Sequence, residues 1–240
     1  MARKFKVNDD IFDKIFGYSI GVIFMKIHSP LKVDPLNKAL LQEQVATFQG
    51  RYTAGDIRQI PNIKAYRHAI AVAGYDPEKS PSIVEQLDRA CLGAKGSQIP
   101  LFADEISNTI NRVSLKYQLA IAAFDGRHIK DDDLVLRFSQ PGDTFKRIGQ
   151  SKAEPCEQNI PVCVAGNEVK AKIMLTQFAD ILVNAESRTV FIAIEGFKSI
   201  NRQQIVMARD ELASYLPTIC DCSLKTGLVD VHNPSFNLEV

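Results

Sequence analysis

Cysteine, histidine and aspartate are the residue types in this 240-residue chain that could bind a metal or attack a substrate. Cys220 and Cys222 flank a single aspartate, and Cys156 and Cys163 lie well upstream. Zinc sites usually take each ligand pair from a gap of two to four residues, and neither pair has that gap. We therefore expect free thiols, with no metal and no cofactor. The odd number of cysteines, without a secreted framework, is typical of a reduced, cytoplasmic protein.

Three other motifs suggest chemistry that their context does not support. The sequence "GAKGSQ" at 93–98 follows a helical pattern and lacks the Gly-Lys-Ser/Thr order of a phosphate-binding loop. The aspartates at 131–133 are consecutive, and three consecutive carboxylates of an extended chain cannot all reach one ion. His68 lies in a helical segment, and nothing in the sequence pairs it with a nucleophile. We interpret these motifs as a loop, a solvated turn and a helix surface.

The composition is typical of a globular protein, with 45% hydrophobic residues and a net charge of +1. A protein that binds nucleic acid through its overall charge has a large excess of Lys and Arg, so any contact with RNA must depend on a local patch. The apolar run "IGVIFMKI" at 20–27 is far shorter than the roughly 20 residues of a membrane helix. The N-terminus has no signal pattern, and we expect a soluble chain with no membrane partner.

Helical spacing dominates the first half of the chain and strand-like runs dominate the second half. Ser82 and Glu85 fit a capping box at the start of a helix that Gly93 ends, and Asn201 is a second predicted N-cap. The other predicted helices are 11–16, 36–48, 63–73 and 106–117. The predicted strands are 20–27, 119–124, 134–138, a short one after 141–143, 162–164, 173–175 and 190–194, and residues from 217 onward are expected to be strand or coil. Without regular βαβ alternation, this order predicts an α+β fold around a β-sandwich, as one domain over residues 1–240.

Four segments carry a resemblance to a known family. They are "YRHAIAVAGYDPEKSPSIVEQL", "NRVSLKYQLAIAAFD", "LVLRFSQPGDTFKRIG" and "ESRTVFIAIEGF", in that order. Together they resemble the B3/B4 domain of the β subunit of bacterial phenylalanyl-tRNA synthetase, and still more the stand-alone B3/B4 proteins described as tRNA- or RNA-binding. The resemblance covers a little over half of the chain and leaves 1–50 and the tail from 217 without support. It implies a β-sandwich with flanking helices and a pocket between strand ends.

The resemblance implies that this pocket edits in the synthetase. It hydrolyses the ester that wrongly joins tyrosine to the phenylalanine tRNA, and polar groups recognise the tyrosine hydroxyl. Asn111 matches the Asn of a Thr-Asn pair, in which Ile110 replaces the Thr. Ala122 stands where the family has its editing His, and Ala193 where a Glu reads the hydroxyl. Gln177 stands in place of a glycine-rich segment.

The remaining candidate residues of the pocket allow two interpretations each. Glu195 follows Ala193 by two residues and shares its strand face, so it could replace the missing Glu in a displaced pocket, or be a solvated strand-end carboxylate. Ala122 and Ala123 leave room for a ligand, or pack closely against a helix. Asn111 contacts a ligand, or bonds to a neighbouring backbone group.

Two functions follow from this resemblance. The first is a binding module for tRNA, another RNA or a small amino-acid-like ligand, which the missing His and Glu favour. The alternative is a free-standing hydrolase of a misacylated tRNA or a related aminoacyl ester, in which Asn111, Glu195 and backbone amides near 122–123 assist water. Arg112 and Lys116 share one helix face. Two interpretations are open for them: they contact RNA phosphates, or they belong to a solvated face. No residue is assigned as catalytic, and the oligomeric state is left open.

Overall fold

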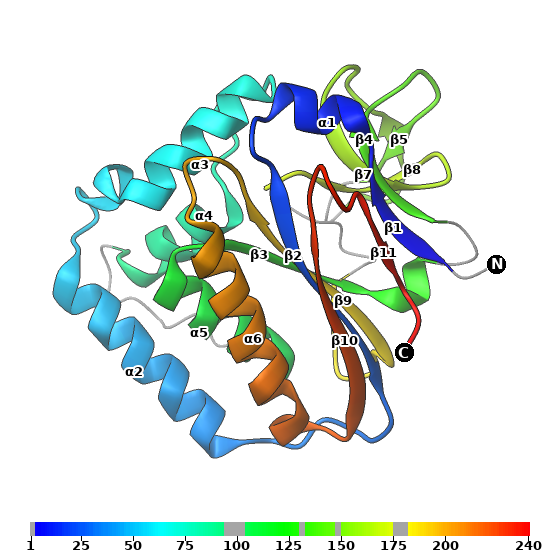
Figure 1. Cartoon of the computed structure of the whole chain (residues 1–240). Helices are drawn as coiled ribbons and strands as arrows, with labels where there is room; N and C mark the ends of the chain where they lie inside the picture. Colours follow the sequence, from blue (N-terminus) through cyan, green and yellow to red (C-terminus); the bar gives the residue numbers. More distant parts are fainter. Residues whose placement is uncertain (1–2, 94–103, 130–132, 147–149, 175–181) are drawn as a thin grey trace.

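The computed structural model describes residues 3–93, 104–129, 133–146, 150–174 and 182–240. The strands in this part of the chain are β1 (Lys4–Val7), β2 (Ser19–Ile27), β3 (Ala120–Asp125), β4 (Leu134–Phe138), β5 (Thr144–Phe145), β6 (Glu154–Pro155), β7 (Pro161–Ala165), β8 (Glu168–Lys172), β9 (Thr189–Gly196), β10 (Cys222–Val229) and β11 (Ser235–Asn237). The α-helices are α1 (Asp9–Lys14), α2 (Pro35–Arg51), α3 (Pro61–Val72), α4 (Ile83–Cys91), α5 (Glu105–Tyr117) and α6 (Arg202–Ile219). The α+β class predicted from the sequence is confirmed (Figure 1).

The strands form two sheets that face one another. The first sheet has four antiparallel strands in the order β10-β2-β9-β3. The second has seven strands in the order β11-β1-β4-β7-β8-β5-β6, with β1 parallel to β4 and β5 parallel to β8. Side chains of the two sheets meet between them, since the rings of Phe5 on β1 and Phe191 on β9 are 5.0 Å apart. The predicted β-sandwich is therefore present.

Helices cover the other face of the four-stranded sheet, where α4 and α5 contact β3 and α6 contacts β2, β9 and β10 (Figure 1). Because both faces are covered, β2 is an almost continuous run of buried residues, with only Lys26 exposed. Buried residues from Phe5 to Leu238 form one hydrophobic cluster. No helix in the described part of the chain is long and apolar enough to span a membrane.

Most predicted elements match the structure, but the strand predicted at 173–175 is wrong at Ile173 and Met174, and residue 175 lies outside the described residues. The strand is β8, and Ile173 and Met174 form a turn in which Met174 has the left-handed φ of 57°. Charged residues on the outer face of β8 obscured its alternation, in which Val169 and Ala171 point inward. Pro217 also lies inside α6, which continues to Ile219 before β10 begins.

The predicted cap of α4 is confirmed in one half and wrong in the other. The Ser82 hydroxyl accepts a hydrogen bond from the Glu85 amide at 3.2 Å, as a capping box requires. The Glu85 carboxylate does not return to Ser82, because it pairs with Arg67 and Arg89. The cap of α6 is confirmed, since the Asn201 side chain accepts a hydrogen bond from the Gln203 amide.

Candidate functional site

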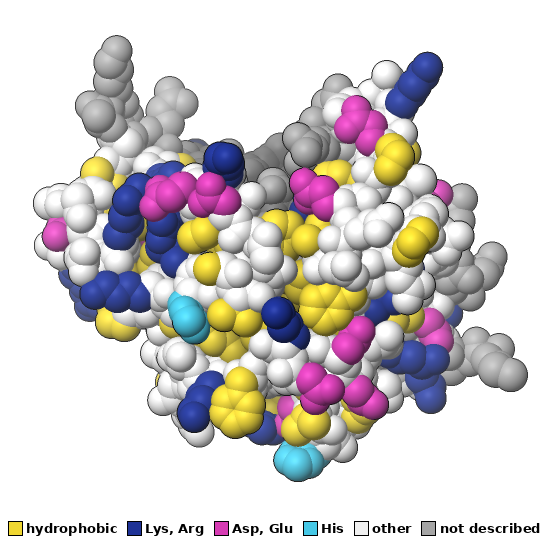
Figure 2. All heavy atoms as spheres, turned by 90° about the horizontal axis from the view of Figure 1, so that it is seen from above, with side chains coloured by type: hydrophobic (Ala, Val, Ile, Leu, Met, Phe, Trp, Pro, Cys, Tyr) yellow, Lys and Arg dark blue, Asp and Glu magenta, His cyan; other side chains and the backbone are white. Residues whose placement is uncertain are grey.

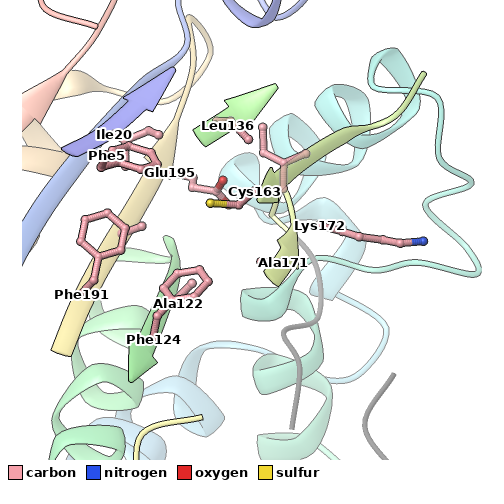
Figure 3. A pocket seen from close by; sticks show the side chains of 12 residues that line it. Phe5, Ile20, Ala122, Phe124, Leu136, Cys163, Ala171, Lys172, Phe191 and Glu195 are labelled. Atoms are coloured by element: carbon pink, nitrogen blue, oxygen red, sulfur yellow. The ribbon is translucent and has the colours of Figure 1, made fainter. Parts of the chain in front are cut away.

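A small cavity lies between the two sheets (Figure 3). Strands β2, β3 and β9 form one wall, and β1, β4, β7 and β8 form the other. Its volume is about 30 Å³. Because one water molecule needs at least roughly 10–15 Å³ measured in this way, the cavity has room for about two water molecules.

Two alanines on adjacent strands provide the room in this cavity. Ala122 on β3 and Ala193 on β9 are direct cross-strand partners, and both line the cavity. Ala123 does not line it, because consecutive side chains of a strand point to opposite faces and Ala123 belongs to the helix-covered face. The alternative that the alanines pack against a helix therefore suits Ala123 and does not suit Ala122.

Of the other two pocket residues named from the resemblance, Asn111 lies away from the cavity and Gln177 cannot be placed, because it lies outside the described residues. Asn111 lies on α5, which packs against the opposite face of the sheet, and it does not line the cavity. Its side-chain nitrogen is buried and has no hydrogen-bond partner, so the predicted bond to a neighbouring backbone group is absent for that atom.

Glu195 is the polar centre of the cavity and is only 8% exposed, so its interpretation as a solvated carboxylate is wrong. The Tyr18 hydroxyl donates to one carboxylate oxygen of Glu195 at 2.7 Å. The Met174 amide donates to the other oxygen at 2.6 Å. The Tyr66 hydroxyl also donates to the backbone carbonyl of Glu195 at 2.5 Å and accepts from the Ala120 amide at 2.9 Å. These contacts hold the carboxylate in one position.

Burial controls the ionisation of this group. Desolvation raises the pKa of Glu195 to about 7, although the hydrogen bonds from Tyr18 and Met174 act in the opposite direction. Cys163 also lines the cavity, and Figure 3 shows it beside Glu195. Burial, and then the charge of Glu195, raise the pKa of the Cys163 thiol, so it is not an activated nucleophile.

The next feature of the site is the charge around Glu195. Within the described residues, no Lys, Arg or His forms an ion pair with it. Lys172 lines the cavity with its stem, but its side chain extends away from Glu195 (Figure 3). The Lys172 ammonium pairs with Glu157 at 2.8 Å and lies 4.8 Å from the ring centre of Phe145. Among the residues that the structure places, the carboxyl group of the cavity therefore has no counter-charge.

The predicted phosphate contacts on α5 are engaged within the protein. Arg112 and Lys116 form ion pairs with Glu211 of α6, at 2.7 and 2.6 Å. Arg112 is only 9% exposed, so its interpretation as part of a solvated face is wrong. Binding of RNA phosphates at this position would have to compete with Glu211.

Sequence reasoning missed several residues that build the site. Phe191 was detectable, because it precedes Ala193 and Glu195 by two and four residues on the same face of β9. Tyr18 and Phe5 gave no such signal, because they reach Glu195 and Phe191 from the N-terminal part of the chain.

Together, the fold and the cavity define an α+β sandwich protein with a small carboxyl-containing site between its sheets. A family model described as the B3/4 domain matches residues 66–220, which is more than half of the chain. The chain therefore belongs to the B3/4 domain family, and the resemblance predicted from its four segments is confirmed.

A solved structure is also similar, namely an N-terminal fragment of the phenylalanyl-tRNA synthetase beta-subunit from Pyrococcus horikoshii. The TM-score is 0.49 at 10% sequence identity, and the alignment covers 94% of this chain and 54% of the other. This chain thus spans about half the length of that fragment. No curated protein sequence matches this chain.

Proposed function

We propose that this chain is a binding module for a small aminoacyl group carried by tRNA or another RNA, and that the group enters the cavity between the sheets. The observation that carries this proposal is the Ala122–Ala193 pair, which opens a cavity beside the Glu195 carboxyl group. The resemblance to the synthetase domain implies a pocket at these two positions. Membership of the B3/4 domain family supports a function related to that of the synthetase domain.

The size of the cavity favours a small aminoacyl group over an aromatic one. A dry cavity that admits benzene has a volume of roughly 150 Å³, and this cavity has about 30 Å³. The walls include Phe5, Phe124 and Phe191, which are buried. A tyrosyl or phenylalanyl side chain would have to displace them. We therefore propose a glycyl-, alanyl- or seryl-sized group, of which the cavity takes only the end that carries the amine.

The surface charge supports only modest affinity for RNA. The net charge is +1, and Figure 2 shows Lys and Arg side chains interspersed with Asp and Glu on the face drawn. Phosphate contacts supply most of the affinity of RNA-binding proteins, and they weaken as salt rises. We therefore expect binding that is detected at low salt and lost at moderate salt.

Binding of charged and uncharged tRNA tests the proposal. Mobility shifts at low salt should show tighter binding of glycyl-, alanyl- or seryl-tRNA than of the same tRNA without its amino acid. Ala122→Leu fills the cavity and should abolish this difference, whereas Ala123→Leu on the opposite face should retain it. Equal affinity for charged and uncharged tRNA in the wild type would contradict the proposal.

The alternative, a hydrolase of an aminoacyl ester, is favoured by one observation. A carboxyl group with a pKa of about 7 is suited to accept a proton from an attacking water at neutral pH. Deacylation of a panel of misacylated tRNAs tests this function. Rates that rise through pH 7 in the wild type and are lost in Glu195→Gln would support it, whereas rates equal to those in buffer would exclude it.

A further inference from the structure

Aromatic rings surround the cavity that contains Glu195. Phe5, Phe124 and Phe191 all line it (Figure 3). The ring centres of Phe5 and Phe191 are 5.0 Å apart, and those of Phe124 and Phe191 are 5.8 Å apart. The face of a phenyl ring carries negative potential and attracts cations within about 6 Å. Rings of this kind form the aromatic cages that bind quaternary and methylated ammonium groups, and the same attraction acts on Lys ammonium groups.

The carboxyl group of the cavity also favours a cationic ligand. The Glu195 oxygens hold one neutral donor each, from Tyr18 and from the Met174 amide. A carboxylate has about four acceptor positions, so further positions remain for a ligand. A buried carboxylate without a cation is unfavourable, and the attraction of an incoming cation would offset part of that cost.

We propose that the cavity binds a primary ammonium group between the phenyl rings and the Glu195 carboxylate, and that this group is the α-ammonium of the aminoacyl ligand. The identification of the ligand rests on the proposed function. Methylammonium has two heavy atoms, which matches a cavity with room for about two water molecules. A hard metal ion does not suit this site, because such ions take at least six oxygen ligands and Glu195 is the one carboxylate among the described lining residues.

Nuclear magnetic resonance of the full chain with ¹³C-labelled alanine methyl groups tests this inference. The Ala122 and Ala193 methyls report on the cavity, and Ala123 reports on the opposite face. The probes are methylammonium chloride and methanol, at matched ionic strength and pH 8. We expect saturable shifts of Ala122 and Ala193 at methylammonium concentrations at least tenfold below those needed for methanol.

Two variants and one pH series complete the experiment. Glu195→Gln should weaken methylammonium binding at least tenfold, and Glu186→Gln, whose carboxylate is 84% exposed, should leave it unchanged. In the wild type, binding should weaken about fivefold or more from pH 8 to pH 6, which provides the test if Glu195→Gln does not fold. The ionisable groups nearest the carboxyl are Tyr18, Tyr66 and Cys163; burial raises all three pKa values, so these groups stay protonated over this range. Lys172 is paired with Glu157.

Each contrary result overturns the inference in a distinguishable way. Equal responses to methanol and methylammonium would show a small-ligand cavity without preference for ammonium, and the proposed function would stand. Unchanged binding in Glu195→Gln would exclude the carboxylate as the ammonium partner. If neither probe shifts Ala122 or Ala193, the ammonium site is excluded, and the comparison of charged with uncharged tRNA separately decides the proposed function.

Discussion

The protein buries two glutamates in contrasting surroundings. Glu85 on α4 is 0% exposed and forms ion pairs with Arg67 at 2.9 Å and Arg89 at 2.6 Å. Glu195 on β9 is 8% exposed and accepts hydrogen bonds from a tyrosine hydroxyl and a backbone amide. Both glutamates are fixed by hydrogen bonds, but of the two only Glu85 has a cation beside it among the described residues.

This difference separates a structural carboxylate from an available one. The two arginines neutralise Glu85, and Arg67 connects α4 to α3, so the bonding capacity of Glu85 is used within the fold. Glu195 faces a cavity and keeps acceptor positions unused, at the cost of a raised pKa. A search for functional carboxylates should therefore examine burial together with the presence of a counter-charge, because burial alone would select both residues.

The largest expected effect comes from removing the cation of the paired glutamate. Arg67→Met leaves buried Glu85 with the half-exposed Arg89 alone, and we expect a loss of about 3–5 kcal/mol in the free energy of unfolding at pH 7. Urea denaturation measures it. Arg58→Met is the matched control, because that arginine is 58% exposed and pairs with Glu78 on the surface, and its loss should cost at most about 1 kcal/mol. Equal effects of the two variants would contradict the distinction.

The second prediction concerns the pH dependence that unpaired Glu195 introduces. Its pKa is about 7 in the folded protein against 4.5 for the ordinary group, so its stabilising contribution is complete below pH 4.5 and is lost as pH rises through 7. At 1.36 kcal/mol per pKa unit, the loss is on the order of 3 kcal/mol. Glu195→Gln should therefore lose less stability than the wild type between pH 4.5 and pH 8.

Two controls isolate this contribution in urea denaturation across the same pH range. Glu186→Gln, on the surface, should retain the wild-type slope. Asp88 has a pKa that burial raises to about 7 as well, so it contributes a loss of the same sign and must remain unchanged in both proteins. Parallel pH profiles of the wild type and Glu195→Gln would refute the assignment.

A smaller effect is expected from removing one donor of Glu195. Tyr18→Phe deletes the hydrogen bond at 2.7 Å, which should raise the Glu195 pKa further and cost about 2 kcal/mol at pH 8, where the carboxylate is charged. The cost should be smaller at pH 5. Tyr75→Phe deletes a bond to the neutral carbonyl of Pro161 and should show no such pH dependence. A cost for Tyr18→Phe that is the same at both pH values would show that its hydroxyl does not support the charged form.

The smallest effect is expected from the cap that orients α4. Ser82→Ala removes the acceptor of the Glu85 amide and should cost about 1 kcal/mol, at any pH between 5 and 8. Thermal unfolding would detect it, with the exposed Ser199→Ala as the control. A loss as large as that of Arg67→Met would mean that the cap, and not the ion pair, positions Glu85.

The sequence allowed much of the fold to be predicted, because the signals are local. The spacing of apolar residues located α2, α3 and α5, and Ser82 and Asn201 marked two helix starts. The strand β1 was missed, because it lies at the N-terminus among charged residues. It is completed by pairing with β4 and β11, more than 120 residues away.

The candidate site was predictable only in part. Alternation along β9 placed Ala193 and Glu195 on one face, and the family resemblance selected Ala122 on the neighbouring strand. The same resemblance named Asn111, which lies on the helix-covered side of that sheet. The position of Asn111 in the family motif does not indicate on which side of the sheet its helix packs.

By itself, the sequence determined the α+β class, most element positions and the alternation that places Ala193 and Glu195 on one face of a strand. Only the tertiary structure decided that Glu195 is buried, that Tyr18 and Met174 hold it, and that no cation pairs with it in the described part of the chain. The physical reason is the distance along the chain over which each property is determined. Helix and strand periodicity depends on neighbours in the chain, whereas the ionisation of a carboxyl group depends on all groups packed around it, which here come from β2, β7 and the turn after β8.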